Sequence, residues 1–126
     1  MGQLRLRGAA TALVTPFKGG AVDYQAYEAL VKMQLSAGID FIVPLGTTAE
    51  TPCLEDAEKL RLLEITRELA ADIPVVAGCG TNSLTKTVAN IRAMEPYSPD
   101  AFLVVVPYYN KPVQEGLYQY FKSVAE

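Results

Sequence analysis

The 126-residue sequence contains no histidine and only two cysteines, Cys53 and Cys79. Without histidine, the chain by itself cannot form a serine–histidine or cysteine–histidine catalytic pair. Two thiolates without an imidazole also fall short of the four ligands that hold a structural zinc ion. Because disulfides are rare in cytosolic proteins, we expect the two thiols to be reduced. We also expect no metal site.

The sequence also lacks an excess of positive charge and a long apolar run. Its net charge is -3, and no basic stripe is interleaved with aromatic residues, so nothing indicates a nucleic-acid partner. The longest apolar run, residues 102–107, is too short to cross a bilayer. The first seven residues lack the apolar centre of a signal peptide. We therefore expect a single cytoplasmic domain, residues 1–126, with no membrane partner.

Four short apolar runs, rich in valine and isoleucine, are present instead: 9–14, 41–45, 74–78 and 101–106. Their nearly continuous apolar character is typical of strands buried on both faces, as in a parallel sheet. An amphipathic segment with apolar residues at helical spacing follows each run. Strands and helices that alternate in this way predict βαβ units and an α/β fold.

The predicted helices have recognisable ends. The first begins at Asp23, a good N-cap residue, and stops at Gly38. The second covers residues 55–70, with Glu55 placed to pair with Lys59. The third is capped by Asn82 or Ser83, and the last carries four apolar residues on one face: Leu117, Tyr120, Phe121 and Val124.

These four units fit either an open wound sheet or half of a TIM (βα)8 barrel with a parallel sheet. The loops after the strands are long and polar, whereas helix-to-strand connections such as residues 71–73 are short. Functional loops follow the carboxyl ends of strands in α/β barrels, while open sheets gather their sites at one switch point. Because three loops here carry chemically useful side chains, we favour four consecutive βα units that form half of a barrel.

Residues 46–50, Gly-Thr-Thr-Ala-Glu, follow the second apolar run and are the first candidate site. Their backbone N–H groups and the hydroxyls of Thr47 and Thr48 could hold a carboxylate or a phosphate. A turn glycine followed by capping threonines explains the same residues equally well. Residues 78–82, Gly-Cys-Gly-Thr-Asn, could also cradle a phosphate. They lack the lysine of a P-loop, however, and fit better as a tight turn before a helix.

Tyr108 and Tyr109 follow the fourth apolar run and form the second candidate site. A tyrosine can relay a proton when its hydroxyl is hydrogen-bonded to another hydroxyl, such as that of Thr48. Tyrosine is also enriched in subunit interfaces, and the two roles are compatible. Lys111 is the only lysine in these loops, and it would need burial to become a Schiff-base nucleophile. We expect it to be solvated instead.

These motifs, in this order and spacing, resemble the dihydrodipicolinate synthase family of class I aldolases over the whole chain. The matching segments are 12–17 (Ala-Leu-Val-Thr-Pro-Phe), 46–50, 74–78 (Pro-Val-Val-Ala-Gly), 107–112 (Pro-Tyr-Tyr-Asn-Lys-Pro) and 114–118 (Gln-Glu-Gly-Leu-Tyr). The resemblance implies a (βα)8 barrel with a small helical C-terminal domain. It also implies a lyase of lysine and diaminopimelate biosynthesis that joins pyruvate to aspartate semialdehyde through a lysine Schiff base, with no metal or organic cofactor.

The resemblance also implies roles for individual residues. Thr47 and Thr48 would hold the carboxylate of pyruvate. Thr48 and Tyr109 would belong to a proton-relay triad, with Tyr109 reaching into the site of a neighbouring subunit. Tyr108 would lie at the same dimer contact. These roles imply a homo-oligomer with a pyruvate-like small-molecule partner.

Three departures from the family pattern bear on these expectations. Ala49 stands where the family usually has glycine, which removes an easy positive φ. Lys86 stands where lysine-inhibited members usually have an acid, so we do not expect lysine regulation through this position. A complete barrel takes about 250 residues, and the family's Schiff-base lysine follows the sixth strand.

We therefore interpret the chain as the N-terminal half of such an enzyme, without barrel units five to eight and the helical domain. We expect it to be inactive alone, because the nucleophilic lysine is missing. The open apolar faces and strand edges of a half-barrel favour association, which again predicts a homo-oligomer. The alternative is a non-catalytic half-barrel that acts as a scaffold or as a weak α-keto acid binder.

Overall fold

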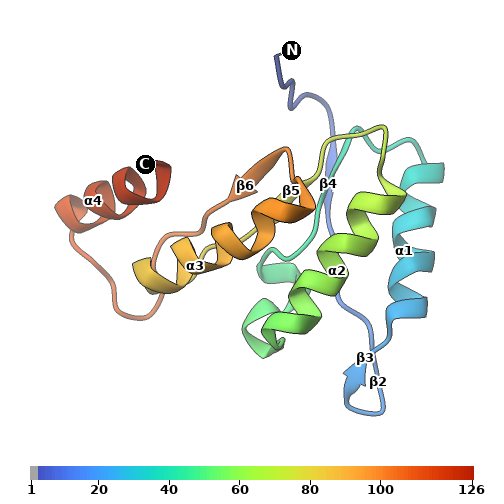
Figure 1. Ribbon diagram of the computed structural model, residues 1–126, viewed down its shortest axis with the longest axis horizontal. Helices are drawn as coiled ribbons and strands as arrows, with labels where there is room; N and C mark the ends of the chain where they lie inside the picture. Colours follow the sequence, from blue (N-terminus) through green and yellow to red (C-terminus); the bar gives the residue numbers. More distant parts are fainter. Residues whose placement is uncertain (1–2) are drawn as a thin grey trace.

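The computed structural model describes residues 3–126 as an α/β fold in which strands and helices alternate (Figure 1). The main strands are β1 (Ala10–Ala12), β4 (Phe41–Val43), β5 (Val76–Gly78) and β6 (Ala101–Leu103). The helices are α1 (Tyr24–Ser36), α2 (Asp56–Leu69), α3 (Leu84–Met94) and α4 (Gln114–Ala125). Short elements complete the description: the hairpin strands β2 (Phe17–Lys18) and β3 (Ala21–Val22), and the 3-10 turns η1 (Thr47–Ala49), η2 (Thr51–Cys53) and η3 (Glu95–Tyr97).

The main strands pair in parallel, as the apolar runs predicted. Strand β1 pairs with β4, and Thr11 lies opposite Ile42; strand β5 pairs with β6, and Ala77 lies opposite Phe102. The α/β class and the parallel strands are therefore confirmed.

Strands β4 and β5 meet along what we call the seam, which joins the two pairs. A single parallel bridge links Ile42 to Val75. The N–H of Ile42 donates to the Pro74 carbonyl at 3.1 Å, and the N–H of Gly78 donates to the Pro44 carbonyl at 2.9 Å. Proline has no N–H to donate, so the ladder between β4 and β5 is sparse. The seam nevertheless places the loops after β4 and β5 side by side.

The hydrophobic core lies between the sheet and the helices. Along β1 and its continuation, Leu13 is 1% exposed while its neighbour Val14 is 49% exposed. Along β6 and its continuation, Phe102 and Val104 pack against the core while Leu103 between them is 48% exposed. Because side chains alternate along a strand, one face of the sheet meets the helices and the other is open. Figure 1 shows α1, α2, α3 and α4 following one another across the molecule in chain order.

The helices α1 and α3 begin next to side chains that cap their first turns, as the sequence predicted. Asp23 caps α1, since its carboxylate accepts a hydrogen bond from the N–H of Ala26 at 3.0 Å. Ser83, one of the two candidates, caps α3. The expected pair between Glu55 and Lys59 is wrong, because Glu55 is the N-cap of α2 and forms a capping box with Glu58.

Arg67, on the last turn of α2, ties this helix to the amino ends of β5 and β6. Its guanidinium donates to the Asp100 carboxylate at 2.6 Å and to the Ile73 carbonyl at 3.0 Å. The same carboxylate accepts the N–H of Val75 at 2.8 Å. Since the side chains of Arg67 and Asp100 are only 22% and 36% exposed, the pair fixes the strand ends opposite the candidate site.

No helix within the described residues has the length and apolar character needed to cross a bilayer. The expectation for the first seven residues involves Met1 and Gly2, which lie outside the described residues.

Candidate functional site

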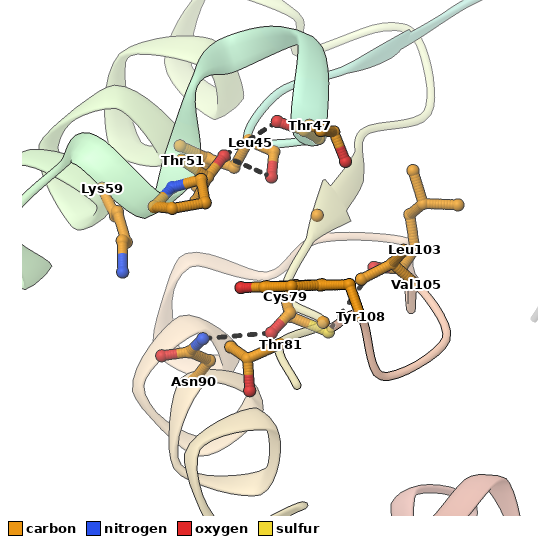
Figure 2. Close-up of a pocket in the computed structure, with 14 residues that line it drawn as sticks. Leu45, Thr47, Thr51, Lys59, Cys79, Thr81, Asn90, Leu103, Val105 and Tyr108 are labelled. Carbon is orange, nitrogen blue, oxygen red and sulfur yellow. Dashed lines mark hydrogen bonds between the residues drawn. The ribbon is translucent and has the colours of Figure 1, made fainter. Parts of the chain in front are cut away.

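The loops after β4, β5 and β6 surround a cavity of about 330 Å³ at the carboxyl ends of these strands (Figure 2). Functional sites of α/β proteins form at this end of the strands. The lining residues come from the last residues of β5 and β6, from these loops and from η2, α2 and α3: Leu45, Gly46, Thr47, Thr51, Pro52, Lys59, Gly78, Cys79, Gly80, Thr81, Asn90, Leu103, Val105 and Tyr108. Two of the predicted site residues, Thr47 and Tyr108, are therefore brought together.

The loop of residues 46–50 is held by Thr51. The Thr51 hydroxyl lies 2.9 Å from the Leu45 carbonyl and 2.8 Å from the Gly46 carbonyl, and the two carbonyls share its single proton. Both Leu45 and Glu50 have positive φ, 63° and 57°. A left-handed non-glycine backbone costs energy and persists only where the surroundings fix it. The loop is thus a preformed structure in which Gly46 is buried and Thr47 is exposed.

Ala49 does not weaken this loop. The positive φ angles fall on Leu45 and Glu50, and Ala49 is a helical residue of η1 with 1% exposure. Its methyl group is therefore a core contact. The glycine usual in the family is not needed for the backbone observed here.

Gly78 and Gly80 allow three backbones to approach one another. A Cβ atom on Gly78 would collide with the backbone of Leu45 and Gly46, across the seam. A Cβ atom on Gly80 would lie 3.1 Å from the Cα of Val104 and still closer to Val105. We predicted a tight turn or a phosphate cradle for residues 78–82. The structure gives these glycines a different role, which is to bring the loops after β4 and β6 against β5.

The α3 side of the cavity contains amide and thiol groups. The Asn90 amide nitrogen donates to the Cys79 carbonyl at 3.0 Å. Burial raises the pKa of the Cys79 thiol to about 11, so this thiol stays protonated and unreactive near neutral pH. Thr81 belongs to a hydrogen-bonded network in which Tyr120 donates to its carbonyl and Thr87 contacts its hydroxyl at 3.0 Å. The network joins the β5 loop to α3 and α4.

The two tyrosines point to different surroundings. Tyr108 lines the cavity and is 43% exposed, whereas Tyr109 is 92% exposed with φ of 69°. The Asn110 amide donates to the Asn82 carbonyl at 3.0 Å, which fastens this loop to the segment before α3. Neither Thr48 nor Tyr109 is among the described residues that line the cavity. The proton-relay role of Thr48 and Tyr109 therefore stays a prediction.

Two lysines near the site differ in burial. Lys111 is exposed, as expected. Lys59 lines the cavity, and its side chain is 15% exposed. Among residues 3–126 no group of three or more histidine, cysteine, aspartate or glutamate side chains could hold a metal ion. The cavity thus combines threonine hydroxyls, a phenol, an amide and one ammonium group, which suits binding of a small polar molecule.

Sequence reasoning did not single out Thr51, Lys59 or Asn90 as site residues. Thr51 directly follows the 46–50 motif, and a hydroxyl at that position was a usable signal. Lys59 and Asn90 lie in helices, where helical spacing shows which residues share a face but not which face meets the cavity.

Residues 5–126 match the model of the dihydrodipicolinate synthetase family. A 4-hydroxy-tetrahydrodipicolinate synthase of Thermotoga neapolitana is 49% identical over 121 residues, which are 95% of this chain and 41% of that relative. The crystal structure of dihydrodipicolinate synthase from Thermotoga maritima has 46% identity and a TM-score of 0.91, covering 94% of this chain and 41% of its own.

The chloride-inhibited enzyme of Acinetobacter baumannii, solved in complex with pyruvate, has 39% identity and a TM-score of 0.92. That match covers 96% of this chain and 42% of the other. The chain thus spans about two fifths of the length of the relatives that it matches. Sequence and structure agree that this chain belongs to the dihydrodipicolinate synthetase family.

Proposed function

We propose that the chain is the N-terminal part of a class I aldolase of lysine and diaminopimelate biosynthesis, located in the cytoplasm, that condenses pyruvate with aspartate semialdehyde. The observation that carries this proposal is the preformed loop of residues 46–50 beside Tyr108, in a chain that belongs to this family. The alternative, a non-catalytic scaffold, is not favoured by relatives that are synthases.

We further propose that the chain forms half of a (βα)8 barrel. Four parallel strands, each followed by a helix, support this. The open face of the sheet carries exposed apolar side chains, including Val14 and Leu103. In a closed barrel, alternate side chains of this kind fill the interior.

In this proposal Thr47 and Thr48 hold the pyruvate carboxylate, and Thr48 and Tyr109 take part in proton transfer. The exposure of Thr47 and its place in the cavity support a binding role. Tyr109 is almost fully exposed on a loop with a fixed backbone. That placement suits a side chain that reaches into a neighbouring subunit, with Tyr108 at the same contact, and it supports a homo-oligomer.

Binding of pyruvate tests the proposed role of Thr47. Calorimetry with the 126-residue chain should detect pyruvate binding, and Thr47→Val should weaken it about tenfold, because a hydrogen bond to a charged group is lost. Thr85→Val is the matched control, since Thr85 is exposed on α3 away from the cavity. Equal affinity of the two variants would contradict the carboxylate-binding role.

Borohydride trapping tests where the nucleophile lies. With pyruvate and borohydride, the chain should acquire no pyruvyl adduct on any lysine, because the proposed Schiff-base lysine lies beyond the length matched here. A stoichiometric adduct on Lys59 or Lys111 would contradict this. Adding a polypeptide with the remaining barrel units of a family member should restore trapping and condensation.

A further inference from the structure

The open face of the sheet is apolar. Leu13, Ile42 and Phe102 point to the core, so their neighbours along each strand point the other way. Six of these neighbours, on three strands, are all apolar: Ala12, Val14, Phe41, Val43, Ala101 and Leu103. A contiguous apolar patch on a protein surface marks an interaction site.

The sheet also has two open edges. Among residues 3–126, β1 pairs only with β4, and β6 pairs only with β5. The Leu13 N–H donates to the Val43 carbonyl at 3.0 Å, and the Leu103 carbonyl accepts the Cys79 N–H at 3.1 Å. Backbone groups alternate between the two sides of a strand, so those of the flanking residues point outward and can pair with another strand.

The layer of helices is open at the same two sides. Helix α1 lies against β1, since the Thr11 hydroxyl donates to Gln34 at 2.7 Å, and α4 follows β6. Figure 1 shows α1 and α4 at opposite ends of the row of helices. Met33 on α1 is 57% exposed, and Tyr118 and Phe121 on α4 are 60% and 38% exposed. Each open strand edge is therefore flanked by a helix with exposed apolar side chains.

The exposed area of the chain is large for its size. The accessible surface is 7844 Å², whereas a compact monomer of 13.6 kDa has about 6,600 Å². The excess is about 1,200 Å² per copy. Part of it belongs to the extended segment before β1, and the rest to the open face and edges. Stable dimers bury about 1,200–2,000 Å² in total, so about half of the excess from two copies is enough for a dimer.

We propose that a second copy of this chain covers the open face, so that two copies close an eight-stranded barrel. The inference rests on the half-barrel of the proposed function. In a twofold dimer, the β6 edge of each copy meets the β1 edge of the other, and all eight strands run parallel around the barrel. Both open edges are then paired, so association stops at two copies. This contact is separate from the one proposed for the Tyr109 loop.

The mass of the particle in solution tests the proposal. The Tyr109→Ala chain is used, because this substitution removes the other proposed contact. Light scattering at micromolar concentration should give twice the 13.6 kDa of one chain and no larger species. Adding Val14→Asp should raise the dissociation constant of the dimer about a hundredfold or more, because an unpaired carboxylate would have to enter the barrel interior. Val113→Asp is the matched control, since Val113 is 75% exposed at the N-cap of α4, outside the strands.

Amide hydrogen exchange gives a second readout that needs no substitution on the open face. The outward N–H groups of Ala12 and Phe102 should exchange about tenfold more slowly in the dimer than after dilution to the monomer, because edge pairing protects them. Circular dichroism would establish that each variant is folded.

Four results would overturn the proposal: a Tyr109→Ala chain that stays monomeric, equal association of the Val14 and Val113 variants, oligomers larger than two copies, or edge N–H groups whose exchange does not depend on concentration. If the monomer binds only a polypeptide with the remaining barrel units of a family member, the open face belongs to those units and not to a second copy. The proposed catalytic function is tested by pyruvate binding and trapping rather than by mass, so its failure and the failure of this proposal give different results.

Discussion

The close contact of Gly78 with the loop after β4 predicts that Gly78→Ala destabilises the protein. The added Cβ atom would overlap the backbone atoms of Leu45 and Gly46. The backbone of Leu45 and Gly46, whose carbonyls accept from Thr51, cannot swing aside as the end of a flexible side chain can. The strands at the seam must therefore separate, or the Gly46 loop must shift.

The magnitude follows from two opposing effects. Gly78 has no positive φ, so alanine would otherwise stabilise the chain by about 0.4–1 kcal/mol through the unfolded state. Overpacking of a filled site costs about 1–3 kcal/mol, and the rigid backbone neighbours place this case at the upper end. We expect a net loss of about 2 kcal/mol, which is a large part of the roughly 5–15 kcal/mol typical of a domain.

Equilibrium urea unfolding, followed by circular dichroism, measures this loss. With a slope of about 2 kcal/mol per M, the midpoint of Gly78→Ala should fall by about 1 M. Gly46→Ala is the matched control in the same loop cluster. Its Cβ atom would lie 3.8 Å from the Leu103 side chain, an ordinary contact, and its φ of -71° suits alanine.

Gly46→Ala should unfold within about 0.3 M of the unmodified chain, since substitutions without strain change stability little. If both variants unfold at the same urea concentration, the close approach of β5 to the Gly46 loop is not the reason for glycine at position 78.

Two further predictions concern the part-buried hydroxyl of Thr51 and the buried hydroxyl of Tyr27. Thr51→Val should lower the free energy of unfolding by about 1–2 kcal/mol, because the two carbonyls lose the proton that they share. Thr51→Ser should retain most of this stability, and equal losses in the two variants would refute the role of the hydroxyl. Burial raises the pKa of Tyr27 from 10.0 to about 12. The folded chain therefore favours the neutral phenol, which contributes its full stabilisation below pH 10. This stabilisation is lost as the pH rises from 10 to 12, because the phenol of the unfolded chain ionises first. Stability should fall there by about 1.4 kcal/mol per pH unit, and Tyr27→Phe should remove this part of the slope in urea titrations at several pH values.

The fold class was predictable because short, locally encoded patterns determine it. The near-continuous apolar runs around Ile42 and Val76 indicated parallel strands, and Asp23 and Ser83 marked helix starts through capping chemistry. The hairpin β2–β3 was missed because each of its strands has two residues, too few for a period-two pattern. Its signal was the Gly19-Gly20 pair, whose positive φ angles form the turn.

The candidate site was only partly predictable. Thr47 and Tyr108 follow strand ends, and the topology of a parallel sheet brings such residues to one edge. Lys59 reaches the same cavity from the first turn of α2, and Asn90 reaches it from the middle of α3. Their direction depends on how α2 and α3 rotate against the sheet, and that rotation is decided by packing rather than by local sequence.

The sparse seam between β4 and β5 has a consequence for the order of folding. Strands β1 and β4 are joined through α1, and β5 and β6 through α3, so each pair can form from one continuous segment. The cavity takes its walls from both pairs, with Thr47 and Thr51 on one side and Gly80 and Leu103 on the other. It therefore exists only after the two pairs have docked. A bound ligand stabilises the docked arrangement by mass action, so occupancy of the cavity and closure of the seam are thermodynamically linked.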